Sequence, residues 1–236
     1  MIEINNISKN FGHIEVLKDV SVTFQAGQCV AIIGPNGCGK TTLIKSVLGM
    51  VLPDKGEILF GGSNIRNNVE YRNEIGYMPQ IGRYPENRTI GQIVDMIKSL
   101  RNFKGKLDDD LINAFHLETI LYKKMHTLSG GTTQKVSALL AFLFDPNVLI
   151  LDEPTAGLDP LASEILKEKI VAEKEKGKLI LITSHLLSEL DDLVTQILFM
   201  QDGKVVFHQS VEELKISSGE ERISKAIAKV LKGQTK

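Results

Sequence analysis

The chain reads Gly34-Pro35-Asn36-Gly37-Cys38-Gly39-Lys40-Thr41-Thr42 between an apolar run over residues 30–33 and a helix-like run over 43–50. A strand, a glycine-rich loop and a helix in this order are the setting of a phosphate-binding P-loop. The glycines let backbone N–H groups turn towards phosphate oxygens where side chains would collide. The helix start adds partial positive charge, Lys40 can bridge the terminal phosphates, and the Thr41 hydroxyl can ligate Mg²⁺. The stretch therefore predicts a nucleotide-phosphate site.

The composition is that of an ordinary globular chain. Its 236 residues, 42% of them hydrophobic, allow a substantial core in one domain, with or without an inserted subdomain. The formal net charge of −1 does not favour nucleic acid or an anionic membrane as a partner. We expect no signal peptide and no membrane span, because the most apolar stretch, 136–151, is interrupted by Asp145-Pro146.

Two cysteines, Cys29 and Cys38, are too few for a disulfide framework and indicate a reduced, cytosolic compartment. Small residues fill a P-loop for steric reasons, and a redox role for Cys38 is the alternative.

The apolar runs fall into two classes of strand. Some are apolar at every position, which is typical of strands buried on both faces of a parallel sheet; they cover 30–33, 148–151 and 179–182. Others alternate apolar and polar residues and favour an antiparallel sheet with one wetter face; they cover 2–7, 16–24, 57–60 and 204–207. Residues 201–204, Gln-Asp-Gly-Lys, predict a hairpin turn. We therefore expect an α/β chain with a mostly parallel central sheet and an antiparallel β subdomain.

Helical patterns cover 40–50, 90–101, 108–115, 131–144, 161–176 and 220–231. Because 81–143 hold mostly helical signals, we expect an inserted helical subdomain there, within one domain over 1–236 that ends in a helix within 217–236. In that last helix an apolar stripe is expected to pack on its own domain; it consists of Ile223, Ile227, Val230 and Leu231. The charged runs 168–169 and 173–176 are expected to form a solvated, salt-bridged helix face.

Two carboxylates, Asp152 and Glu153, end the apolar run 148–151. Asp152 could hold Mg²⁺ through water, opposite Thr41. Glu153 points differently and can act on an attacking water. An acid pair at the end of a buried strand is costly unless a cation or hydrogen bonds satisfy it. The alternative is that the carboxylates only cap the next turn.

A second glycine-rich turn opens a helix at 128–135, which read Leu-Ser-Gly-Gly-Thr-Thr-Gln-Lys. Free N–H groups and the helix dipole could bind an anion here too, although Ser-Gly-Gly also makes ordinary N-caps. Two such helix starts leave two possibilities. Either the chain binds two phosphates, or a second copy of the protein completes one site.

Over nearly its whole length the sequence resembles the ATP-binding subunit of ABC transporters. The resemblance rests on motifs that stand in the family's order. Residues 34–42 resemble Walker A, and Gln80 after Tyr77-Met78-Pro79 resembles the Q-loop. Residues 128–135 resemble the LSGGQ signature, and 149–153 resemble Walker B with its glutamate. Gly157-Leu158-Asp159 resembles the D-loop, and His185 resembles the switch histidine.

The resemblance implies a P-loop NTPase, RecA-like core and a head-to-tail dimer that holds two ATP molecules, each between the P-loop of one copy and the signature of the other. It implies catalytic roles for Glu153 at the water, for His185 at the γ-phosphate and for Gln80 at Mg²⁺ or the water. The implied Mg²⁺ ligands are Thr41, Gln80 and Asp152. The implied ATP-binding residues are Phe11, Val16, Gly34, Pro35, Asn36, Gly37, Cys38, Gly39, Lys40, Thr41, Thr42, Ser129, Gly130, Gly131 and Asp159.

Alternatives stay open at two of these positions and at one segment. Phe11, the expected adenine-stacking residue, could be a plain core residue, and a lone histidine such as His185 is often structural. Residues 81–86, Ile-Gly-Arg-Tyr-Pro-Glu, could form the family's groove for a short helix of a membrane subunit, or an ordinary surface loop.

The chain departs from the family pattern inside the signature. Thr132 replaces the common Gln, and Lys135 replaces the common Arg. The Ser-Gly-Gly core is intact, so phosphate contact should survive. Lysine cannot offer the bidentate fork of arginine, so the helix behind the signature can be anchored differently.

We therefore expect an ATPase subunit that powers a membrane transporter. Its partners would be a second copy of itself, or a homologous ATPase subunit, and a multi-span membrane permease subunit, with no nucleic acid. It would be cytoplasmic and peripheral on the inner face of the cell membrane.

The short chain resembles ATPases paired with ABC-2-type exporters. Residues 77–85 and 131–135 resemble copper-processing ATPases of nitrous oxide reductase maturation, although no metal-ligand cluster in the sequence supports this.

Two other functions are alternatives. A soluble ABC-type ATPase acting on ribosomes or DNA would usually carry two ATPase halves or long coiled coils, and the charge balance argues against it. A nucleotide-binding switch with negligible turnover would not need Glu153 and His185.

Overall fold

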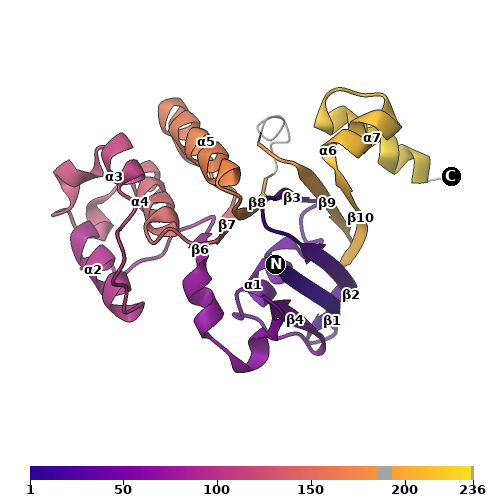
Figure 1. Ribbon diagram of the computed structural model, residues 1–236, viewed down its shortest axis with the longest axis horizontal. Coiled ribbons are helices and arrows are strands. Elements are labelled where there is room, and N and C mark those ends of the chain that lie inside the picture. The colour runs from indigo at the N-terminus through magenta and orange to yellow at the C-terminus, as the bar shows by residue number, and fades with distance from the viewer. Residues whose placement is uncertain (185–192, 235–236) are drawn as a thin grey trace.

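The computed structural model describes residues 1–184 and 193–234. A six-stranded sheet runs through the middle of the molecule in the order β10-β9-β3-β8-β7-β6 (Figure 1). Its strands are β3 (Cys29–Ile33), β6 (Ile75–Met78), β7 (Val148–Asp152), β8 (Leu179–Thr183), β9 (Gln196–Gln201) and β10 (Lys204–Ser210). Neighbouring strands are parallel except at the β9–β10 hairpin. The predicted α/β class with a mostly parallel central sheet is confirmed.

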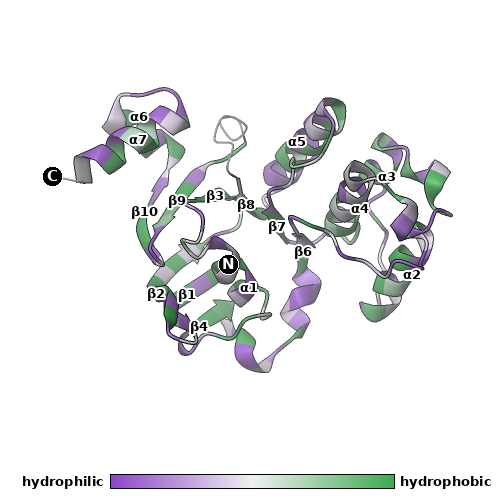
Figure 2. Cartoon of the chain, turned by 180° about the vertical axis from the view of Figure 1, so that it is seen from behind, coloured by the Kyte–Doolittle hydropathy of each residue, from purple (hydrophilic) through white to green (hydrophobic). Residues whose placement is uncertain are grey.

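A second, antiparallel sheet has the order β2-β1-β4-β5. Its strands are β1 (Ile2–Phe11), β2 (Ile14–Phe24), β4 (Lys55–Phe60) and β5 (Ser63–Asn64). Hydrophobic and hydrophilic residues alternate along β1 and β2, as the sequence predicted (Figure 2).

The helices are α1 (Lys40–Val47), α2 (Ile90–Leu100), α3 (Asp110–Ala114), α4 (Gly130–Phe142), α5 (Pro160–Glu175), α6 (Val211–Ser218) and α7 (Ile223–Gln234). Short 3₁₀ helices cover Ile65–Asn67, Glu70–Glu74, Leu117–Ile120 and Met125–Thr127. We refer to residues 81–143 as the helical insertion. Its helices α2, α3 and α4 gather at one end of the molecule, away from α6 and α7 (Figure 1). No helix in the described part of the chain combines the length and hydropathy needed to cross a membrane.

Alternate residues of the central strands enter two different hydrophobic cores. In β3, Cys29, Ala31 and Ile33 belong to the core shared with the helical insertion and α5. Val30 and Ile32 belong to the core shared with α1 and the antiparallel sheet. The same alternation holds in β7 and β8. Apolar residues at every position of these strands follow from this burial on both faces.

Two predictions for the C-terminal segments, the hairpin turn and the packing of the last helix, can be compared with the structure. Asp202 and Gly203 both have positive φ, 51° and 82°, as the predicted hairpin turn requires. Ile223 and Ile227 are buried, and the rest of the apolar stripe packs against the same core, so its packing on the chain's own domain is confirmed.

The prediction of a solvated charged face on α5 is wrong for its central residues. Lys169 and Glu173 are buried, with 7% and 0% of their surface exposed. They can be buried because they pair with each other and with further charged groups from outside α5. Asp108 and Asp110 lie 61 and 59 residues from Lys169, where a helix-periodicity argument does not reach. The further partners of Glu173 follow the end of α5.

Candidate functional site

The P-loop lies between the end of β3 and the start of α1, where glycine is required by both conformation and space. Gly39 caps α1 with φ 108°, and a Cβ there would lie 2.9 Å from the Val16 carbonyl oxygen. Gly34 has φ 150°, and a Cβ there would lie 2.0 Å from the Met200 carbonyl oxygen. The loop backbone therefore packs directly on β2 and β9, which fixes the direction of its N–H groups.

Lys40 is nearly buried, with 9% of its surface exposed. Its Nζ donates to the carbonyl oxygens of Gly34, at 2.7 Å, and Pro35, at 3.1 Å. The ammonium is thus hydrogen-bonded to uncharged carbonyl oxygens of the P-loop itself. A cation in this setting can still gain from an anionic ligand.

A cavity of about 530 Å³ brings ten of the predicted site residues together. It is lined by Val16, Asn36, Gly37, Gly39, Lys40, Thr41, Thr42, Gln80, Asp152 and Glu153. Its volume is within the usual range of small-molecule sites. The Thr41 hydroxyl, the Gln80 amide and the Asp152 carboxylate provide the oxygen donors that Mg²⁺ prefers, beside a phosphate cradle. The residues present therefore fit both ATP and Mg²⁺.

The end of β7 is held by a threonine that the sequence argument missed. Thr183, 1% exposed, is the register partner of Asp152 in the parallel β7–β8 pair. Its hydroxyl donates to Oδ1 of Asp152 and accepts the backbone N–H of Glu153 at 3.1 Å. The bond to Oδ1 gives a hydrogen-bond donor to a carboxylate that would be costly to bury alone. A hydroxyl residue directly after the apolar run 179–182 was the signal that could have found it.

The backbone turns at Glu153, directly after β7 ends at Asp152. The φ of Glu153 is +50°, a left-handed conformation that is unusual for a residue with a side chain. Hydrogen bonds from its N–H to both the carbonyl and the hydroxyl of Thr183 stabilise this turn. Neighbouring Tyr77 stays a neutral phenol, because burial and the charge of Asp152 raise its pKa to about 12.

The second predicted anion site is the start of α4. Ser129 is the N-cap, and its Oγ accepts the N–H of Thr132 at 3.2 Å. The Thr132 hydroxyl lies 2.8 Å from the same Oγ. Thr132, which stands where the family commonly has Gln, therefore fixes the Ser129 side chain through these contacts. This turn exposes Ser129 and does not line the P-loop cavity.

The signature and the D-loop contact each other within the chain. Asp159 caps α5 by accepting the N–H of Ala162 at 2.9 Å, and its Oδ2 pairs with Lys135 Nζ at 2.7 Å. The hydrogen bond from Lys135 is the main cause that lowers the pKa of Asp159. A Cβ on Gly131 would lie 3.0 Å from the Gly157 carbonyl oxygen, so the two loops also touch through their backbones.

The other predicted residues are placed as follows. Phe11 ends β1 with 50% of its surface exposed, and the Lys9 ammonium lies 5.5 Å from its ring centre. The ring is therefore not a buried core residue and is accessible for stacking. Pro35 and Cys38 belong to the loop backbone, and Cys38 is buried beneath it. His185 lies outside the described residues.

The sequence profile of the ABC transporter family matches residues 17–156. The chain belongs to the ABC transporter family. It is 32% identical to ABC transporter ATP-binding protein YtrB of Bacillus subtilis over 217 residues, 91% of this chain and 74% of that protein. It is also 32% identical to Nod factor export ATP-binding protein I of Burkholderia lata, over 87% of this chain and 69% of that protein.

Solved structures agree with the family and the fold. The structure described as the ATP-binding subunit of an ABC transporter superposes with a TM-score of 0.89 at 28% identity, covering 98% of both chains. The dimeric ATP-binding cassette MJ0796 in a post-hydrolysis state with ADP and phosphate has a TM-score of 0.80. At 23% identity, over 89% of this chain and 99% of that one, it supports the fold alone. This ABC ATPase is therefore the ATP-binding subunit of an ABC transporter, with a P-loop NTPase core.

Proposed function

We propose that this ATPase hydrolyses ATP in two sites formed between two copies, and that closure and opening of this pair drive a membrane-embedded transport partner. One observation carries the proposal. The chain has two helix starts suited to phosphate, but Ser129 does not line the cavity that holds Lys40, Asp152 and Glu153. A second copy in head-to-tail orientation would place its Ser129, Gly130 and Gly131 over the triphosphate.

Within one site, the residues divide the chemistry as follows. Lys40 and the N–H groups of the loop hold the β- and γ-phosphates. Thr41, Gln80 and Asp152 would hold Mg²⁺, which when bound neutralises phosphate charge. Glu153 lines the same cavity and orients a water, accepting its proton as the oxygen attacks the γ-phosphorus. The bond to the β–γ bridging oxygen breaks, and ADP and phosphate leave.

Four further residues complete the site on the strength of the resemblance. Phe11 stacks on adenine with its exposed ring, and Val16 packs beside it at the cavity wall. His185 hydrogen-bonds the γ-phosphate. Asp159 supports the signature of its own copy through Lys135, which adds a structural role to the one implied by the D-loop.

The membrane partner is proposed to dock between the core and the helical insertion. A cavity of about 330 Å³ lies there, lined by Leu48, Met50, Arg72, Ile75, Tyr77, Pro79, Arg83, Tyr84, Ile97, Arg101 and Leu140. Two residues of the predicted docking segment, Arg83 and Tyr84, line it. Tyr84 also donates to Ser137 of α4 at 2.9 Å. The cavity also borders Gln80 along the chain. A short helix bound here would lie beside Gln80, which contacts the nucleotide site, and would contact α4, which we call the signature helix.

The transport direction is proposed from a relative. The protein from Burkholderia lata is described as a Nod factor export ATP-binding protein, which agrees with the resemblance to ABC-2-type exporters. We therefore propose an exporter subunit that acts at the inner face of the cell membrane. The narrower resemblance to copper-processing ATPases stays a prediction from the sequence.

The Glu153→Gln variant tests the proposal. It keeps the cavity and the charge of Lys40 but loses the acceptor for the proton of water. We expect it to bind ATP, to lose most turnover and to elute at twice the mass of the chain in ATP by light scattering. A protein that stays monomeric in ATP, or that hydrolyses it normally, would overturn the proposal. Salt-sensitive binding to RNA or DNA in place of a membrane partner would favour the soluble alternative.

A further inference from the structure

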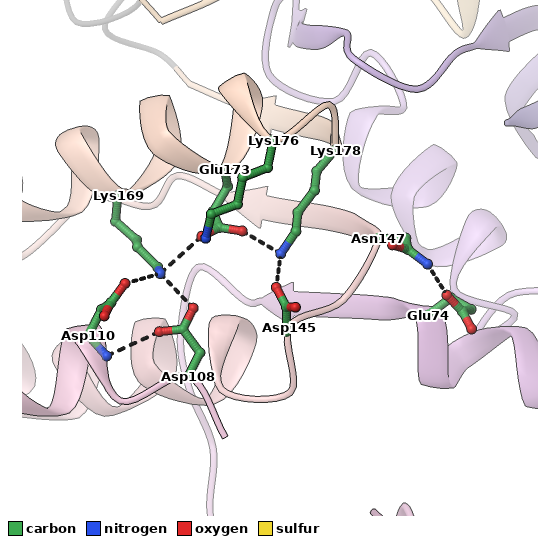
Figure 3. A network of polar contacts seen from close by, with 9 residues as sticks. All are labelled: Glu74, Asp108, Asp110, Asp145, Asn147, Lys169, Glu173, Lys176 and Lys178. Carbon is green, nitrogen blue, oxygen red and sulfur yellow. Dashed lines mark hydrogen bonds and ion pairs between the residues drawn. The ribbon is translucent and has the colours of Figure 1, made fainter. Parts of the chain in front are cut away.

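The charged groups on α5 form a cluster that joins this helix to the helical insertion (Figure 3). Lys169 Nζ lies 2.6 Å from Asp108 Oδ2, 2.7 Å from Asp110 Oδ2 and 3.0 Å from Glu173 Oε1. Asp108 and Asp110 belong to the insertion, at the start of α3. One buried ammonium thus contacts carboxylates from two parts of the chain.

Glu173 extends the cluster to the far end of the signature helix. Its fully buried carboxylate also pairs with Lys176, at 2.8 Å, and with Lys178. Lys178 pairs in turn with Asp145, three residues past the end of α4. The N–H of Asp108 donates to the Leu143 carbonyl oxygen at 2.9 Å, so the same segment also holds the end of α4.

These contacts clamp α4 at the end opposite to Ser129. With 13 residues, α4 is about 20 Å long at 1.5 Å per residue. A tilt of ~5° about the clamped end would therefore move Ser129 by roughly 2 Å, which is enough to misplace a group that must meet a transition state. Apolar packing is not directional and tolerates such a tilt better than a multidentate ion cluster does.

We propose that Lys169 and Glu173 are positioning residues, which hold the signature helix at the angle that lets Ser129 meet the triphosphate of the opposite copy. The proposal rests on the head-to-tail site described above. The cluster acts through α4 and touches no nucleotide. Breaking it should therefore spare binding at the P-loop of the single chain and weaken assembly of the shared site.

The test compares Lys169→Met with Lys167→Met. Lys167 lies on the same helix and pairs with Glu164 at 2.8 Å on a more exposed face, so it is a matched control for the loss of one ion pair. Spin labels at Lys98→Cys in α2 and Lys55→Cys in β4, both exposed positions, report the insertion against the core. Cys29 and Cys38 are buried and should label poorly. Labelled protein is diluted with unlabelled protein so that distances within one chain dominate.

We expect Lys169→Met to broaden the distance distribution and to raise the ATP concentration for half-maximal turnover at least fivefold, while nucleotide affinity without turnover changes less than twofold. Lys167→Met and Lys169→Arg should behave like wild type. Wild-type distances and turnover in Lys169→Met would overturn the proposal. If that variant does not fold, Asp108→Asn removes the ion pair between Lys169 and Asp108, and the same distance and turnover criteria apply. A wild-type protein without ATPase activity would instead refute the proposed function, while the distances would still test the clamp.

Discussion

Lys135 of the signature helix lies 2.7 Å from Asp159 of the D-loop, with Nζ on Oδ2. The other oxygen of the same carboxylate caps α5, so one side chain joins the signature helix to the segment that follows Walker B. Both side chains are partly exposed, at 24% and 52%, so this pair matters for position more than for stability.

We predict that Lys135→Ala lowers the rate of ATP hydrolysis about tenfold, because the signature turn and the D-loop lose their fixed spacing. Lys135→Arg should keep most activity, since its guanidinium reaches the same carboxylate. Steady-state ATPase assays with thermal melting check this. Equal activity in Lys135→Ala and wild type would show that the contact has no positioning role.

Thr183 supplies the next prediction, because its hydroxyl bonds to both acidic residues of Walker B. Thr183→Val keeps the shape but leaves the Asp152 carboxylate and the Glu153 N–H without that partner. We expect a loss of about 1–3 kcal/mol in the free energy of unfolding, and at least a tenfold loss of turnover. Thr183→Ser should restore both. Urea titrations and ATPase assays measure these effects, and an unchanged Thr183→Val protein would refute the role.

Gly34→Ala tests the packing of the P-loop on β9. Its Cβ would approach the Met200 carbonyl oxygen to 2.0 Å, so the loop must move. We expect a loss of at least about 2–3 kcal/mol in unfolding free energy, together with much weaker nucleotide binding. Gly27→Ala is the control, because Gly27 also has positive φ but no atom within 4 Å of the added carbon. Similar losses in both variants would mean that strain alone, and not the contact, decides.

Glu173 should make stability depend on pH in the acid range. Burial alone would raise its pKa, but hydrogen bonds from Lys176, Lys178 and Lys169 lower it to about 2. The folded-state pKa is below the ordinary glutamate value of 4.5, so this stabilisation is present above pH 4.5 and is lost as the pH falls towards 2. At about 1.4 kcal/mol for each pH unit between 4.5 and 2, we expect about 3 kcal/mol from this group. Wild type should therefore lose more stability than Glu173→Gln between those pH values in denaturant titrations, and parallel curves would contradict this.

Much of the fold could be predicted because the pattern of apolar residues in each strand shows which of its faces are buried. The runs at β3, β7 and β8 are apolar at every position since alternate residues enter two cores. Strand β6 escaped prediction because Ile75-Gly76-Tyr77-Met78 has few β-branched residues, and Gly76 is needed there for space: a Cβ would lie 1.9 Å from the Ala141 carbonyl oxygen. Helix α6 is short and begins directly after Ser210, the last residue of β10, so no loop separates its sequence pattern from that of the strand.

The candidate site was predictable where a motif is continuous in the chain, as in the P-loop and the acid pair of Walker B. Contacts between distant segments were not. Thr183 meets Asp152 only because β7 and β8 are register partners, and Lys169 meets Asp108 from 61 residues away. Such partners are set by the tertiary fold, which no local pattern encodes.

The central claim is that each ATP site uses the P-loop of one copy and the signature of the other. Complementation between two inactive variants tests it most directly. Lys40→Ala disables the P-loop of its own copy, and Ser129→Arg blocks the signature of its own copy, so each should be inactive alone. In a mixed dimer, the Lys40 of the Ser129→Arg copy meets the intact Ser129 of the Lys40→Ala copy. An equimolar mixture should recover up to about a quarter of the wild-type ATPase rate, because half of random dimers are mixed and each has one intact site. A mixture no more active than the two variants measured separately, with mixed dimers verified, would contradict the account.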